Sequence, residues 1–185
     1  MPATHRTFQE PELSGFFYLE TSFIGGLYLP FSHTYRRFHH ECVQFLQRLS
    51  LHPDVLCFTS GWTLNEAAHL LQQRQLLLDC QAYNIQHGTS LTPEELRQQN
   101  PAILAHSYNE LMRIRAHIER GCEIMAIPNT GLTDAAFNLI RDFHLRPTDA
   151  YHIATARAYD ITNFVSIDRD FLRVDGITVY TCLLP

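Results

Sequence analysis

The chain has 185 residues, of which 45% are hydrophobic and 18% are charged, and this balance excludes a disordered chain, a collagen and a coiled coil. The net charge of −5 argues against a protein that coats nucleic acid without specificity. All fourteen basic residues are arginine, and the absence of lysine excludes a P-loop or a Schiff-base enzyme.

The sequence predicts a cytoplasmic protein without a membrane anchor. Apolar runs such as Phe16–Leu19 are too short to cross a bilayer, and residues 1–15 lack the apolar stretch of a secretory signal. The five cysteines are scattered without a C-x-x-C pair, and the eleven histidines show no H-x-x-x-H or H-E-x-x-H pattern. We therefore interpret the cysteines as buried thiols and most histidines as surface or core residues.

In chain order, the first part of the sequence predicts an extension and then strands that alternate with helices. Short apolar runs between turn residues predict strands, and apolar residues at helical spacing predict helices. The elements are an extension over residues 1–14, a strand Gly15–Leu19, a loop with Gly25, Gly26 and Pro30, a helix from about Thr34 to Ser50, a strand Val55–Thr59, and a helix that Thr59 or Ser60 caps and that runs through Leu71.

The remainder begins with a polar, glutamine-rich segment over residues 80–100. Within it, Thr92–Glu95 has the spacing of a capping box with proline at the first helical position. The elements that follow are a helix from Pro101 toward Arg120, a strand Glu123–Ile127, a short helix from Thr133 through Ile140, a helix from Pro147 to Ala158, and strands Asn163–Ile167 and Ile177–Thr181.

This alternation predicts an α/β fold in three layers, α/β/α, with a central mostly parallel sheet that helices cover on both faces. No internal repeat and no linker divides residues 15–185, which we interpret as one domain. Residues 79–146 carry more predicted helix than a simple alternation needs. We therefore interpret this part of the domain as containing a helical insertion.

Four acidic residues lie where loops leave the carboxyl ends of the predicted strands, or close by. Glu20 ends the first strand, and Asp168 directly follows the strand Asn163–Ile167. Glu66 lies about two turns into its helix, and Asp149 lies in the first turn of another. Sites in parallel α/β sheets form at this edge, so the four acids are candidates for one shared site.

Four carboxylates in one cleft repel one another unless protons or a cation relieve the repulsion. Hard carboxylate oxygens select Mg²⁺ or Mn²⁺, and such a metal can activate water and stabilise charge on a phosphoryl oxygen. The start of its helix is expected to favour the ionised form of Asp149. Each acid also has a structural interpretation, because Asp149 alone could be a cap and Glu66 alone a surface residue.

The residues around the acids form motifs. In Leu145–Tyr159 an aspartate followed by alanine opens an alanine-rich helix, and in Phe164–Phe171 a strand ends in serine, one residue and aspartate, with phenylalanine three residues on. Tyr18–Ser22 and Thr59–Glu66 carry the other two acids, in matching order. Together these motifs resemble the PIN domain family, and most of all its VapC-type toxin ribonucleases, over residues 15–181 apart from the extra helical segment.

The resemblance implies a PIN-like fold and a metal-dependent ribonuclease whose products end in a 3′-hydroxyl and a 5′-phosphate. It also implies a homodimer and, for a toxin of a toxin–antitoxin pair, an antitoxin protein as partner. The resemblance implies that four acids are catalytic residues and ligands of Mg²⁺ or Mn²⁺, namely Glu20, Glu66, Asp149 and Asp168. Glu66 would either ligate the metal or orient the attacking water. The resemblance implies Thr21 and Ser22 as supporting hydrogen-bond donors. Arg146, Arg169 and Arg157 are candidates for phosphate contacts, and each has an equal interpretation as a solvated charge at a helix end. Asp170 is expected to act as a cap or an ion-pair partner rather than a metal ligand.

One departure from the family pattern leaves an alternative open. The first acid of the family is normally aspartate, whereas Glu20 extends its carboxylate one methylene further from the backbone. The alternative is a catalytically weak or inactive PIN-fold module that binds RNA or protein. A haloacid-dehalogenase phosphatase or a receiver domain would need an aspartate after the first strand and a lysine, and the chain has neither. A purely structural subunit leaves the four acids unexplained.

Overall fold

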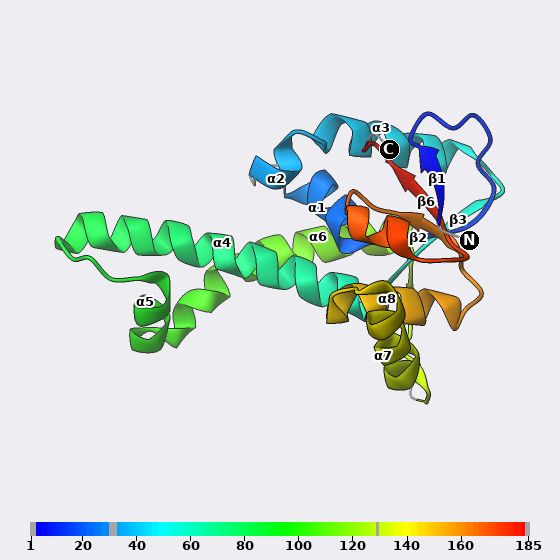
Figure 1. The fold of residues 1–185 in the computed structure, drawn as a ribbon. Coiled ribbons are helices and arrows are strands. Elements are labelled where there is room, and N and C mark those ends of the chain that lie inside the picture. The colour runs from blue at the N-terminus through cyan, green and yellow to red at the C-terminus, as the bar shows by residue number, and fades with distance from the viewer. Residues whose placement is uncertain (1–2, 30–32, 129, 184–185) are drawn as a thin grey trace.

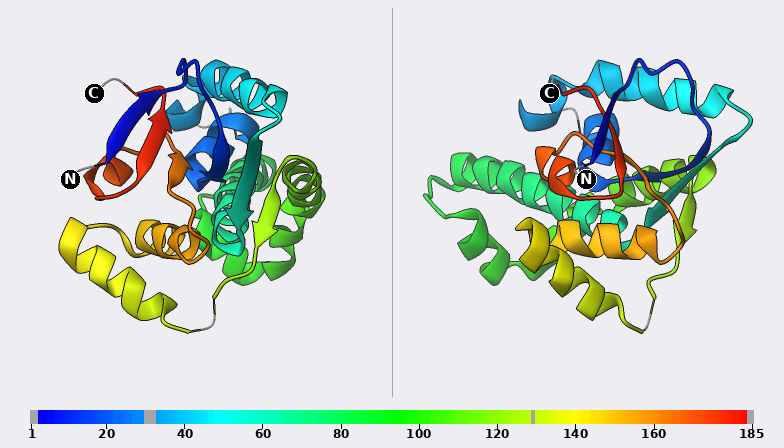
Figure 2. Two further views of the ribbon diagram at one scale, coloured as in Figure 1. Left: turned by 90° about the vertical axis from the view of Figure 1, so that its right-hand side faces the viewer. Right: turned by 45° about the vertical axis from the view of Figure 1, so that its right-hand side comes forward.

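In the computed structural model, which describes residues 3–29, 33–128 and 130–183, six strands form one sheet (Figures 1 and 2). The strand order is β1-β6-β5-β2-β3-β4, and all five pairs of neighbours are parallel. The predicted α/β fold with a mostly parallel sheet is confirmed. The strands are β1 (Thr4–Thr7), β2 (Gly15–Leu19), β3 (Val55–Ser60), β4 (Glu123–Met125), β5 (Asn163–Val165) and β6 (Thr178–Thr181).

Helices cover both faces of this sheet (Figure 2). The helices are α1 (Thr21–Tyr28), α2 (His33–Arg36), α3 (His39–Leu51), α4 (Gly61–His87), α5 (Pro93–Gln99), α6 (Tyr108–Gly121), α7 (Leu132–Phe143) and α8 (Pro147–Arg157), with 3₁₀ helices η1 (Pro101–Ser107) and η2 (Arg169–Arg173). Among the described residues, no helix has the length and apolar character needed to cross a membrane.

The side chains of β2 alternate between two hydrophobic cores, as expected for a strand buried on both faces. Phe17 and Leu19 belong to the core beneath α1, α3, α4 and α6. Tyr18 points the other way, into the core beneath α7 and α8. The sheet is therefore the middle of three layers. The strand order reverses at β2, because β3 lies on one side of β2 and β5 on the other. At such a point the connecting loops leave the sheet in opposite directions, and a cleft is expected at the carboxyl end of β2.

The segment from α4 to α6, residues 61–121, forms a helical arm that extends beyond the sheet (Figure 1). Its first helix runs to His87 and ends at Gly88, which has a left-handed φ of 63°. It is longer than predicted because its second half packs in a small core of its own with Leu96 and Ile103. The predicted capping box at Thr92 is confirmed. The single helix predicted after Pro101 is instead η1 followed by α6.

The loop predicted around Gly25 and Gly26 is wrong, because both glycines lie inside α1. A Cβ atom on Gly25 would lie 2.8 Å from the ring of Tyr35, and one on Gly26 would lie 2.6 Å from Sγ of Cys42. These glycines therefore serve close packing rather than a turn. Pro30, placed in the same loop, lies outside the described residues. The helix predicted from Thr34 to Ser50 is divided into α2 and α3.

The N-terminal segment contributes to the sheet, although its sequence did not predict a strand. β1 pairs in parallel with β6, and Phe8 stacks on Phe45 with ring centroids 4.3 Å apart. Two strands end earlier than predicted, β4 at Met125 and β5 at Val165. After β5, the backbone N–H of Ile167 donates to the Ser22 hydroxyl instead of continuing the ladder.

Candidate metal centre

Glu20 directly follows β2 and caps the N-terminus of α1 with its own side chain. Its Oε2 atom accepts hydrogen bonds from the Ser22 backbone N–H at 2.9 Å, from the Ser22 hydroxyl, and from the Ser166 hydroxyl at 2.9 Å. The side chain is only 4% exposed. Burial raises the pKa of Glu20 above its ordinary value, although nearby His152 and these hydrogen bonds act in the opposite direction.

Ser166 connects the ends of β2 and β5. Its hydroxyl donates to Glu20 and accepts from the backbone N–H of Asp168 at 3.0 Å. Asp168 in turn accepts from the backbone N–H of Asp170 at 2.9 Å and so caps η2. One buried hydroxyl therefore fixes the first and last predicted acids relative to each other.

Glu66 enters the site from α4. Its Oε2 atom accepts from the Thr21 hydroxyl at 2.6 Å and lies 2.7 Å from Nε2 of His152. Burial alone would raise the pKa of Glu66, but the hydrogen bonds from His152, Thr21 and Thr148 outweigh it and lower that pKa. Glu66 is therefore held as an ionised carboxylate.

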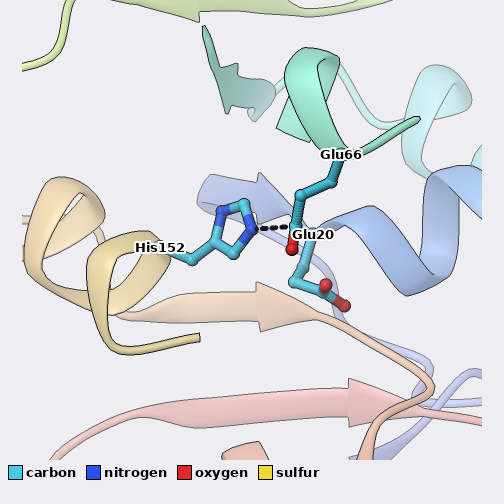
Figure 3. Close-up of side chains that lie close together, drawn as sticks. All are labelled: Glu20, Glu66 and His152. Carbon is cyan, nitrogen blue, oxygen red and sulfur yellow. Dashed lines mark hydrogen bonds and ion pairs between the residues drawn. The ribbon is translucent and has the colours of Figure 1, made fainter. Parts of the chain in front are cut away.

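His152 is a site residue that the sequence analysis missed. It lies on α8, is 0% exposed, and points its ring at Glu66 (Figure 3). On the far side of the ring, Nδ1 lies 2.7 Å from the Tyr18 hydroxyl, which lies 2.7 Å from the Ser60 hydroxyl. Because ionised Glu66 can only accept, the ring donates to it through Nε2. The signal was its position three residues after Asp149, which puts both on one helix face.

Asp149 is buried without a full set of partners. It is the third residue of α8 and is 7% exposed, and in the described part of the chain its Oδ2 atom has no hydrogen-bond partner. Burial, with the negative charges of Glu20, Asp168 and Glu66, raises its pKa from 3.8 to about 7. Burial and the neighbouring acids therefore act against the start of the helix, which was expected to favour the ionised form of Asp149.

The structure brings the four predicted acids to one edge of the sheet in two adjoining groups. In the first, one ligand atom each from Glu20, Glu66 and His152 lies within 4.8 Å of the others. In the second, the same holds for Asp149, Asp168 and Asp170. Asp170 also pairs with Arg173 at 2.7 Å, in line with the ion pair expected for it.

The predicted supporting residues divide into those near the acids and one that lies apart. Ser22 donates to Glu20, as expected for it, and Thr21 donates to Glu66. Arg146 and Arg169 are exposed and flank Asp149 and Asp168 in the chain. Arg157 ends α8 at the opposite terminus from Asp149 and donates to the carbonyl of Asp175. The position of Arg157 contradicts a contact with phosphate at this site.

The donor set fits a hard divalent cation. Carboxylate oxygens are the ligands that Mg²⁺ and Mn²⁺ prefer, and a cation would partner the buried Oδ2 atom of Asp149 and relieve the repulsion that raises its pKa. Without a cation, a buried carboxylate oxygen that lacks a partner is unfavourable by roughly 1–3 kcal/mol or more. The arrangement is therefore matched to a positive charge at this point.

Comparison with known proteins identifies the family. A search of curated proteins finds no match. VapC20 of Mycobacterium tuberculosis, described as a toxin that cleaves the sarcin-ricin loop, superposes with a TM-score of 0.54 at 17% identity, covering 84% of this chain and 92% of that one. VapBC2 of Rickettsia felis, bound to a promoter DNA fragment, gives a TM-score of 0.50 at 12% identity, with 90% and 98% covered. VapBC-1 of nontypeable Haemophilus influenzae gives 0.50 at 14% identity, with 89% and 96% covered.

These structures share the fold of this chain at low sequence identity. The decisive match is at the level of sequence, where the family model of the PIN domain matches residues 18–177. That range begins inside β2 and ends just before β6, so it contains all four acids. This chain belongs to the PIN domain family.

Proposed function

We propose that this protein is a metal-dependent ribonuclease that hydrolyses phosphodiester bonds of RNA at the site formed by Glu20, Glu66, Asp149 and Asp168. The observation that carries the proposal is the buried Oδ2 atom of Asp149, which lacks a partner although three other acids surround it. Membership of the PIN family supports a nuclease.

Mg²⁺ or Mn²⁺ would be held by the four carboxylates, and when bound it supplies the positive charge that activates water and stabilises a phosphoryl oxygen. The protein contributes orientation. Ser166 and Ser22 hold the Glu20 carboxylate, and Thr21 holds that of Glu66. Such partners around a metal ligand typically change affinity or activity 10- to 100-fold, roughly.

Glu66 is the group that would orient the attacking water. Its lowered pKa keeps it ionised at neutral pH, so it can accept a hydrogen bond from water. His152 fixes the direction of its carboxylate from the buried side. Attack of water at phosphorus, with cleavage of the bond from phosphorus to the 3′-oxygen, would leave the phosphate on the 5′ end of one product and a hydroxyl on the 3′ end of the other.

The relatives support a substrate class and a partner for this proposal. Cleavage of an RNA loop by VapC20 supports RNA as substrate class, and the exposed Arg146 and Arg169 beside the acids are suited to phosphate contacts. The VapBC assemblies among the similar structures support an antitoxin protein as partner. We also propose a homodimer, as the family resemblance implies.

A catalytically weak binding module is the second candidate, and one observation favours it. The three hydrogen bonds that the Glu20 carboxylate accepts from Ser22 and Ser166 end on a single oxygen, Oε2, and fold the longer side chain back over the start of its own helix. Oε1 then remains as the ligand atom. If this geometry holds the carboxylate too far from the reacting phosphate, RNA would bind without being cleaved.

The test is cleavage of a labelled single-stranded RNA with Mg²⁺, Mn²⁺ or EDTA. Asp149→Asn is compared with Asp134→Asn, a matched control because Asp134 is the third residue of α7 and is exposed. The proposal expects metal-dependent cleavage that Asp149→Asn abolishes and Asp134→Asn keeps. RNA binding without cleavage in the wild type under both metals would instead establish the binding module.

A further inference from the structure

Cys57 in β3 and Cys122, the residue directly before β4, lie on two neighbouring segments of the sheet. β3 pairs with β4 so that Phe58 is opposite Glu123 and Thr59 is opposite Ile124. Continuing this register by one residue places Cys57 opposite Cys122, whose backbone is extended at φ −142° and ψ 143°. Directly opposite residues of a sheet share one face, and both thiols indeed pack against the same hydrophobic core.

The distance across the strands suits a disulfide. Neighbouring strands lie roughly 4.7–4.9 Å apart, inside the range of about 4.4–6.8 Å that disulfides span between Cα atoms. Both cysteines are free thiols and half-buried, and each side chain shifts the pKa of the other. Closing the bond would therefore need side-chain rotation rather than movement of the strands.

The chemistry of the two thiols is unequal. Interaction with Cys122 lowers the pKa of Cys57, whereas interaction with Cys57 and burial raise the pKa of Cys122. Since the thiolate is the nucleophile, the direction of these shifts favours Cys57 as the attacking sulfur and Cys122 as the resolving one. Both also line a pocket of about 620 Å³ between the end of α3 and the junction of α6 with β4, so a small oxidant can reach them.

We propose that Cys57 and Cys122 are a modification site, a dithiol that hydroperoxides oxidise to an intrachain disulfide. The Cys57 thiolate attacks the peroxide, the O–O bond breaks, and Cys57 becomes a sulfenic acid while an alcohol or water leaves. The sulfur of Cys122 then attacks that of Cys57, the S–S bond forms, and the sulfenic hydroxyl leaves as water with the proton of Cys122. Two thiols lose two electrons, and the peroxide gains them.

The position of the pair gives the bond a structural consequence. Cys57 precedes and Cys122 follows the helical arm of residues 61–121, so the disulfide would close a loop around the whole arm. Cross-links that close long loops restrict the unfolded chain most. Oxidation is therefore expected to raise the Tm by about 5 °C or more and to keep both parts of a nicked arm together.

The experiment treats the full chain with hydrogen peroxide, alkylates the remaining thiols, and maps tryptic peptides without reduction. Cleavage after arginine places each of the five cysteines in a different peptide, with Cys57 in residues 49–74 and Cys122 in residues 121–141. We expect these two peptides to be joined and the other three cysteines to be alkylated. Prior reduction with a thiol reagent should restore five labels.

Three variants separate this site from general oxidation. Cys57→Ser and Cys122→Ser should each abolish the joined peptide and the rise in Tm, whereas Cys80→Ser, at a buried thiol in the helical arm, should change neither. Unchanged circular dichroism of each variant verifies that it folds. A disulfide between Cys42 and Cys182, overoxidation of Cys57 without a joined peptide, or five intact thiols would each overturn the proposal.

Discussion

The Nε2 atom of His152 lies 2.7 Å from Oε2 of Glu66, and the imidazole that makes this contact is fully buried. The ring is held from behind by the Tyr18 hydroxyl at Nδ1. Tyr18 comes from β2, His152 from α8 and Glu66 from α4, so one chain of hydrogen bonds connects three elements. It gives Glu66 a fixed direction and a lowered pKa, which the Glu66 side chain could not obtain on its own.

His152→Ala should lower kcat for RNA cleavage about 10- to 100-fold with a smaller change in KM. The loss of the hydrogen bond that lowers the pKa of Glu66 should move the acidic limb of the pH–rate profile to higher pH. His152→Gln, which keeps a donor near Glu66, should recover part of both effects. A profile that keeps its position in His152→Ala would show that the residue serves packing alone.

Ser166→Ala should weaken binding of Mn²⁺ about 10-fold, measured by isothermal titration calorimetry. The change removes the hydroxyl that joins Glu20 to the backbone N–H of Asp168, so both carboxylates become less ordered. Ser50→Ala is the control, because that exposed hydroxyl donates to a carbonyl of its own helix. Equal affinities in the two variants would contradict the role of Ser166.

The fold and the positions of the acids could be predicted because each depends on local sequence. Apolar runs such as Gly15–Leu19 specify strands, and parallel strands send their carboxyl ends to one edge, so Glu20 and Asp168 had to lie near each other. The strand Thr4–Thr7 could not be predicted, since its pattern is polar and its partner β6 lies at the other end of the chain.

Other parts of the site depend on contacts between residues that are far apart in the sequence, which local sequence patterns cannot predict. The spacing of His152 from Asp149 fixes its helix face, but nothing local shows that Glu66, 86 residues away, meets that face. In the same way, a Gly-Gly pair is compatible with a turn or with close packing, and only the positions of Tyr35 and Cys42 decide for packing. The charge state of Asp149 likewise depends on neighbours brought together by folding.

Metal affinity should rise with pH until Asp149 is ionised. Its pKa of about 7 means that the metal must displace a proton in more acidic solution. Below that pKa, each pH unit should weaken the apparent affinity for Mn²⁺ about tenfold, and above it the dependence should level off. Calorimetry from about pH 5.5 to about pH 8.5, in buffers of different ionisation enthalpy, would measure the proton release. An affinity that is constant over this range would contradict the raised pKa.

Asp149→Asn should make the metal-free protein more stable at alkaline pH even as it removes activity. The folded state raises the pKa of this acid, so the folded protein favours the protonated form. The stabilisation of the folded protein by protonated Asp149 is complete below the ordinary pKa of 3.8 and is lost as pH rises through about 7. Asparagine never ionises, and the variant should gain on the order of 1 kcal/mol at about pH 8, with the gain vanishing toward about pH 4. Urea denaturation in EDTA measures this difference in the free energy of unfolding. A variant that is less stable than the wild type at alkaline pH would contradict a destabilising effect of ionised Asp149.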